Sequence, residues 1–107
     1  MSNRLSVERL EVLEQKYGVE INTTAYLEYN EFEEQDEIKV IGEIMSGNLN
    51  TDLDVVTSVY NPQGEIIGTA SSYIDSDTFE GIEPFSEIIS IPKGEQVGKV
   101  RIYPKQC

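Results

Sequence analysis

From Val19 onward, apolar side chains recur at every second position in successive segments, and groups of turn-forming residues separate these segments. A period of two is typical of a β-strand, whose alternate side chains face opposite sides of a sheet. Strands are predicted at residues 19–30, 38–45, 53–60, 65–74, 86–92 and 97–104. About six or seven short strands with regular turn signals predict a mainly β fold, an antiparallel β-sandwich or a barrel.

The first 17 residues follow a helical period instead. The apolar positions with this spacing are Val7, Leu10, Leu13 and Tyr17, and the glutamates between them fall on other faces. Ser6 could cap the start of a helix, and Gly18 suits the position just past its end. We therefore predict a short N-terminal helix over residues 1–17 that packs on its own domain. A strand through Leu10 and Val12, or a helix that docks on a partner, is the alternative.

The length of 107 residues suits a single domain, residues 1–107, with the helix in 1–17 and the sandwich in 18–104. The only cysteine, Cys107, is the last residue, so an intrachain disulfide is impossible. The opening residues lack the apolar core of a signal peptide, and no apolar run reaches the ~18 residues of a membrane span. A cytoplasmic location is expected, or an extracytoplasmic one if a signal has been removed.

The chain carries 20 acidic and 8 basic residues, which give a formal net charge of −12. Such a charge repels phosphate backbones and anionic lipid surfaces, so nucleic-acid binding and membrane insertion are not expected. It favours a basic protein partner or a cation through long-range attraction. The alternative is that the acidity only keeps a small protein in solution.

The sequence contains no histidine, which removes catalytic triads, imidazole bases and histidine-ligated zinc. Phosphate-binding glycine motifs are absent as well. Paired carboxylates remain, but a chain this short rarely forms the cleft that glycoside hydrolysis requires. We therefore expect no enzyme activity, no catalytic residues and no cofactor.

Two kinds of residue remain as candidates for binding. If a calcium site exists, Asp75 and Asp77 are the first candidates, because hard cations prefer clustered oxygens in loops. A solvated polar edge explains these two residues at least as well. Tyr26 and Tyr29 are candidates for an interaction surface, because tyrosine is enriched at interfaces. They fall on opposite faces of one strand, so only one of them is expected in the core.

The segment "TSVYNPQGEIIG", residues 57–68, is predicted to be a hairpin corner. Tyr60 ends an alternating strand, and Pro62 presets the backbone for the second position of a turn. Gly64 can adopt a positive φ, and Asn61 can close the turn through its side chain.

With the strands placed, the chain resembles the bacterial FxLYD-type domain over about residues 38–103. The matching positions are Val40, Gly42, Tyr60, Gly64, Ile66, Ile67 and Phe85. The naming motif falls on residues 57–61, where Tyr60 matches, Val59 is a conservative change and Asn61 replaces an aspartate. The resemblance implies an immunoglobulin-like β-sandwich that serves as an accessory or interaction module, often outside the membrane, without catalytic residues.

The leading hypothesis is therefore a non-enzymatic β-sandwich module that mediates protein–protein interaction or self-association. A homodimer could form by pairing of exposed strand edges. The alternative is an acidic inhibitor or immunity-type protein that blocks a basic partner such as a toxin or nuclease.

Overall fold

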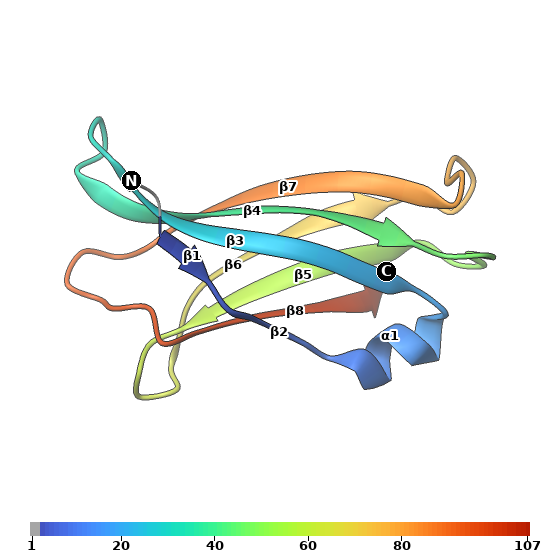
Figure 1. Cartoon of the computed structure of the whole chain (residues 1–107), viewed down its shortest axis with the longest axis horizontal. Helices are drawn as coiled ribbons and strands as arrows, with labels where there is room; N and C mark the ends of the chain where they lie inside the picture. The colour runs from blue at the N-terminus through green and yellow to red at the C-terminus, as the bar shows by residue number, and fades with distance from the viewer. Residues whose placement is uncertain (1–2) are drawn as a thin grey trace.

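All six alternating segments form strands in the computed structural model, which describes residues 3–107 (Figure 1). The strands that follow the N-terminal region are β3 (Glu20–Asn30), β4 (Gln35–Met45), β5 (Leu53–Tyr60), β6 (Ile66–Ile74), β7 (Ile82–Ser90) and β8 (Lys99–Gln106). Two three-residue strands and one helix precede them: β1 (Asn3–Leu5), β2 (Val7–Arg9) and α1 (Glu11–Tyr17).

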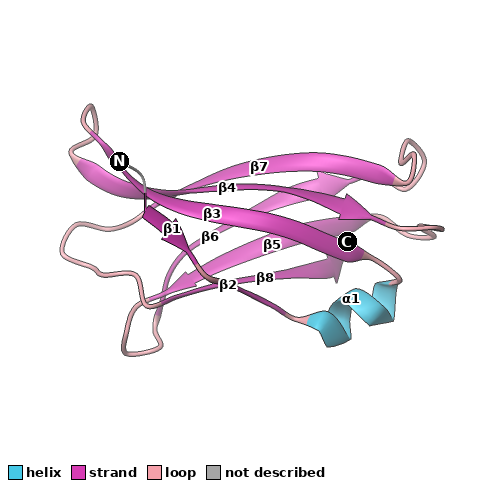
Figure 2. Ribbon diagram, viewed as in Figure 1, coloured by secondary structure: helices cyan, strands magenta, loops and turns pink. Residues whose placement is uncertain are grey.

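The strands form two four-stranded sheets that face each other (Figure 2). One sheet has the order β1-β3-β4-β7, and the other has the order β2-β8-β5-β6. Neighbouring strands are antiparallel except for β2 and β8, which run parallel. The prediction of a mainly β, two-sheet sandwich with a short helix is confirmed.

The core lies between the sheets, where the inward side chains of both sheets meet. Inward positions of β5 such as Leu53, Val55 and Val59 are fully buried, as are Ile38, Val40 and Ile44 of β4. Burying an aliphatic side chain of this size contributes about 1.5–3 kcal/mol. The alternation seen in the sequence is therefore the alternation between core and solvent.

Gly42 shows that a close backbone approach, and not a bulge, explains the glycine in β4. A Cβ at this position would lie 2.7 Å from the Phe85 ring and 2.7 Å from the Asn22 carbonyl oxygen. Phe85 is the direct neighbour of Gly42 on β7, so its ring occupies the space that a side chain would take.

The prediction of a helix throughout residues 1–17 is wrong for most of its length. Residues 3–5 pair with β3, the chain crosses between the sheets at Ser6, and residues 7–9 pair with β8. Ser6 is therefore a crossing point and not a helix cap, and α1 begins without a side-chain cap. Three-residue strands are too short to show a period of two, which is why the helical spacing dominated. Met1 and Ser2, which the prediction also covered, lie outside the described residues.

Helix α1 packs on its own domain as predicted, through an unexpected residue. Glu14 is only 3% exposed, although its spacing placed it with the outward glutamates. The Arg9 guanidinium donates to both of its carboxylate oxygens, at 3.1 Å and 2.6 Å, and the Ile21 amide donates to Oε1 at 3.2 Å. Gly18 ends the helix with φ 67°, as predicted.

Candidate interaction surfaces at one end of the sandwich

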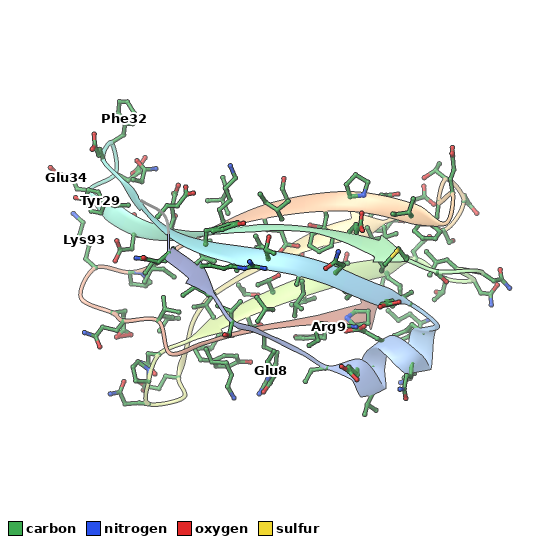
Figure 3. All side chains as sticks on the ribbon, in the orientation of Figure 1. Glu8, Arg9, Tyr29, Phe32, Glu34 and Lys93 are labelled. Atoms are coloured by element: carbon green, nitrogen blue, oxygen red, sulfur yellow. The ribbon has the colours of Figure 1, made fainter. Side chains whose placement is uncertain are left out.

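The β3–β4 hairpin presents a phenylalanine to solvent at its tip. Residues 31–34 form the turn, and the side chain of Phe32 is fully exposed (Figure 3). The Asn30 side-chain oxygen accepts hydrogen bonds from the amides of Phe32 at 3.0 Å and Glu33 at 3.1 Å. Its Nδ2 donates to Glu37 across the hairpin at 3.2 Å. Three hydrogen bonds of the Asn30 side chain therefore fix the turn that exposes Phe32.

The hairpin around Phe32 is strongly acidic. Residues 28–37 contain six acidic and no basic residues. Tyr29, 60% exposed, lies on the core-facing side of β3 beyond the buried part of that strand. Together with Glu34 and Lys93 it lines a shallow hollow of about 160 Å³ (Figure 3). Two exposed aromatic residues, Phe32 and Tyr29, therefore lie on one acidic hairpin, a surface suited to contact with another macromolecule.

The predicted corner after β5 is confirmed, and it forms the wall of a second surface feature. Asn61 is 4% exposed, and its Oδ1 accepts hydrogen bonds from the amides of Gln63 at 3.1 Å and Glu65 at 2.9 Å. The Gly64 amide donates to the Asn61 carbonyl at 3.0 Å, and Gly64 has φ 85°. The turn is therefore held by the asparagine side chain, as its sequence indicates.

Beside this turn lies a pocket of about 320 Å³ whose lining includes Tyr60, Pro62, Lys99 and Arg101. The Arg101 guanidinium lies over the Tyr60 ring, with its Cζ 5.1 Å from the ring centroid, and Nη1 donates to the Tyr60 hydroxyl at 3.4 Å. This cation–π contact fixes the ring as one wall of the pocket.

Glu8 of β2 neutralises part of the positive charge at this pocket. Its carboxylate accepts a hydrogen bond from Arg101 Nε at 2.6 Å and lies 3.7 Å from Lys99 Nζ. The bond to Arg101 is the main cause that lowers the pKa of Glu8. Lys99 and Arg101 are the two cations of the pocket lining. The carboxylates of Glu65 and Glu95 also lie close by, because both accept hydrogen bonds from the Asn61 side chain, which lines the pocket too.

The loop between β7 and β8 joins the hairpin to the pocket. At its start, the Ile91 amide donates to the Asp36 carbonyl at 2.9 Å, and Gln35 Nε2 donates to the Ile91 carbonyl at 2.9 Å. At its end, the Gly98 amide donates to the Tyr60 carbonyl at 2.7 Å. The β3–β4 hairpin and the β5–β6 corner lie at the same end of the sandwich, one on each sheet (Figure 1). Because the pocket is lined by that corner, it lies at the same end as the acidic hairpin.

The structure places the two tyrosine candidates differently, and neither is buried. Tyr29 belongs to the acidic hairpin, whereas Tyr26 is half-buried on the outer face of its sheet. There Tyr26 lies in a cross-strand row with Arg4, Lys39 and Ile88. The expectation that one of the two would enter the core is wrong, because Tyr29 lies on the inward side of β3 but past the region that the second sheet covers.

The calcium candidates lie in the loop after β6, at the opposite end from the hairpin. Asp75 uses its carboxylate to accept a hydrogen bond from the Asp77 amide at 2.9 Å, which closes a local turn. Among residues 3–107, no group of three or more potential metal ligands lies together. The structure therefore gives these two residues a turn-forming role and supplies no coordination sphere around them.

A carboxylate–phenol pair lies near the same loop. Hydrogen bonds from the Ser76 amide and hydroxyl, both at 2.9 Å, lower the pKa of Asp52. A hydrogen bond to the Asp52 carboxylate is the main cause that raises the pKa of Tyr73 to about 12, and burial and the negative charge of Asp52 add to it. This pair connects β6 to the residue that precedes β5, and Ser76 holds its carboxylate in place.

Sequence reasoning missed Phe32 and the pocket as candidates. Phe32 carried a signal, because it is the only apolar residue in the run "EFEEQDE". Lys99 and Arg101 alternate with Val100 and Ile102, which marks an outward basic face on β8, but their neighbour Tyr60 comes from a distant segment.

Comparison with protein-family models, with curated proteins and with solved structures found no match. Within residues 3–107, no helix has the length and apolar character needed to cross a lipid bilayer.

Proposed function

We propose that this protein is a non-enzymatic β-sandwich module that binds other proteins through the β3–β4 hairpin. The observation that carries the proposal is Phe32, whose side chain is fully exposed on a turn that Asn30 holds in place. Exposing an aromatic ring to water has an unfavourable free energy. A hydrogen-bonded turn that holds the ring in solvent is therefore expected where a partner protein buries it.

The fold is proposed to be immunoglobulin-like, in the broad sense that covers the FxLYD-type domains. Support comes from the two facing sheets and from the hairpin corner at Tyr60, where the resemblance requires one. The strand order differs from that of constant-type immunoglobulin domains. In those domains the second strand pairs with the fifth, whereas here the first long strand, β3, pairs with the strand that follows it, β4. Sandwich domains of this group share the architecture without always sharing the topology.

The second candidate is an acidic inhibitor or immunity-type protein that blocks a basic partner such as a toxin or nuclease. One observation favours it: six of the 20 acidic residues gather within residues 28–37 of one hairpin. An acidic protrusion of this kind can enter a basic cleft and compete with an anionic substrate.

The proposal is tested by capture of binding proteins with the purified chain. Phe32→Ala should reduce capture at least about tenfold, because a central aromatic anchor carries much of the binding energy of an interface. Val12→Ala is the matched control, since Val12 is 78% exposed on α1, away from the hairpin. Equal capture by the wild type and by Phe32→Ala would contradict the hairpin as the binding site.

Salt dependence separates the two candidates. The association rate of an inhibitor with a basic partner should fall steeply between low and physiological ionic strength, because screening removes the long-range attraction. A captured partner of neutral charge, with an association rate that does not change with ionic strength, would count against the inhibitor.

A further inference from the structure

We infer that the Tyr60–Arg101 pocket receives Phe32 from a second copy of this chain, so that two copies associate through their hairpin ends. This inference rests on the proposed function, because it uses the same hairpin and assigns it one particular partner. Each copy would then supply the Phe32 ring to its partner's pocket.

The pocket suits a phenyl ring in size and in chemistry. Its volume is about 320 Å³, whereas a cavity of about 150 Å³ already holds a benzene ring. Pro62 and the ring of Tyr60 provide apolar walls, and the Arg101 guanidinium can attract the face of an incoming aromatic ring. The pocket therefore offers Phe32 both apolar surface and a cation.

Charged groups of opposite sign lie beside the two surfaces. Phe32 is flanked by Glu31 and Glu33, and the pocket lining contains Lys99 and Arg101, with the carboxylates of Glu8, Glu65 and Glu95 around it. Lys99 is the cation that remains most available, because its side chain is 48% exposed and lies 3.7 Å from Glu8. When a neighbouring Phe32 enters the pocket, its flanking carboxylates approach this partly exposed ammonium group.

The position of both surfaces at one end of the sandwich favours a closed, two-fold arrangement. Each copy extends its hairpin from one sheet, and its pocket belongs to the other sheet. Rotating one copy by half a turn about an axis between two such ends brings each hairpin towards the sheet that carries the opposite pocket. A two-fold contact of this kind uses the same residues from both copies and closes on itself without forming a fibre.

Three of the four edge strands, β1, β2 and β7, are less suited to self-association than the hairpin ends. At one side of the sandwich the edge strands β1 and β2 are only three residues long. At the other side β7 contains Pro84, and its Glu87 points inward to accept a hydrogen bond from Ser72 at 2.6 Å. Short edges, prolines and inward charges are the features by which proteins prevent edge pairing.

The test is sedimentation equilibrium of the purified chain at concentrations up to about 500 µM, a range suited to the weak binding expected of a small interface. The wild type should form dimers, and Phe32→Ala and Lys99→Glu should each weaken dimerisation at least about tenfold. Val12→Ala should dimerise like the wild type. Lys99→Ala is a second pocket variant that removes the positive charge without reversing it. Thermal unfolding of each variant checks that it is folded.

A mixture of two variants gives the decisive result. Phe32→Ala keeps an intact pocket, and Lys99→Glu keeps an intact Phe32, so a mixed dimer regains one complete contact. The mixture should therefore associate more strongly than either variant alone. A wild type that stays monomeric at about 500 µM overturns the inference. So does a dimer that Phe32→Ala leaves unchanged, or one that both substitutions of Lys99 leave unchanged.

These results are separable from a failure of the proposed function. If the wild type is monomeric while Phe32→Ala still abolishes capture of a different protein, the hairpin binds a partner and only the identity of that partner was wrong. If Phe32→Ala affects neither self-association nor capture, the proposed function fails together with the inference.

Discussion

Asn61 illustrates how much of a turn one side chain can determine. It accepts two backbone hydrogen bonds through Oδ1, and Nδ2 donates to the Glu65 carboxylate at 2.9 Å. These bonds satisfy backbone groups that the short loop cannot pair in a ladder. The Gly98 amide also bonds to the Tyr60 carbonyl just before the turn, so the corner is tied to the start of β8.

Gly64→Val should lower the free energy of unfolding by about 1–2 kcal/mol. Gly64 has φ 85°, a conformation that a β-branched residue adopts only with strain, and the cost is purely conformational because a Cβ there meets no atom within 4 Å. Gln63→Ala in the same turn is the control and should change stability by less than about 0.5 kcal/mol. Chemical denaturation measures both variants, and equal stability of Gly64→Val and wild type would show that the turn is not strained.

Tyr73 should ionise with a pKa of about 12, which a spectrophotometric titration of tyrosinate can measure against a Tyr73→Phe variant. The folded-state pKa is raised above the ordinary value of 10.0, so its contribution to stability is complete below about pH 10 and is lost as the pH rises through about 12. Asp52→Asn should return the pKa towards 10.0. Asp77→Asn, which leaves the pair intact, should not move it.

At the scale of elements, α1 is attached to the sandwich by charge as much as by apolar contact. A seven-residue helix is too short to be stable alone. The buried Glu14 holds Arg9 of β2 and the Ile21 amide of β3, so one carboxylate connects the helix to both sheets. The helix is therefore held by contacts that its own periodicity does not reveal.

Glu14→Gln should destabilise the protein by about 2 kcal/mol, because Arg9 loses its charged partner beside a buried site. Glu11→Gln, on the exposed side of the same helix, should change stability by less than about 0.5 kcal/mol. Thermal and urea unfolding provide the comparison. A loss no larger than that of the control would mean that apolar contacts alone attach α1.

The β3–β4 hairpin shows why the sequence predicted its boundaries only in part. The second strand was predicted to begin at residue 38, yet Gln35–Glu37 also belong to β4 and pair with Glu28–Asn30. Tyr29 is 60% exposed on the inward side of this segment, so the hairpin end does not bury a regular apolar face. Only backbone hydrogen bonding defines the strand at the hairpin end. Backbone hydrogen bonding does not require alternating apolar residues, so the sequence shows no strand pattern there.

At the scale of the molecule, the strands that line the core were predictable because burial imposes alternation on them. Residues 53–60 were predicted with the bounds that β5 has, and its inward positions are buried. The candidate surfaces were not predictable in the same way. The pocket joins Tyr60 to Lys99 and Arg101, which are about 40 residues apart in the chain, and only the pairing of β5 with β8 brings them together.

The net charge of −12 is unevenly distributed over the fold. Residues 28–37 account for six negative charges, whereas Lys99, Arg101 and Lys105 share one face of β8. The molecule therefore has an acidic protrusion and a basic strand face, and the total charge conceals this separation. Association is governed by such local fields once two surfaces approach within about a Debye length.

The parallel pairing of β2 with β8 determines how the fold responds to tension. These strands lie near the two ends of the chain and run in the same direction. A force that pulls the ends apart slides one strand along the other, so it loads the hydrogen bonds of the pair together and does not peel them open one by one. Three residues near the N-terminus thus form a mechanical clamp, and the chain should resist stretching more strongly than its modest size suggests.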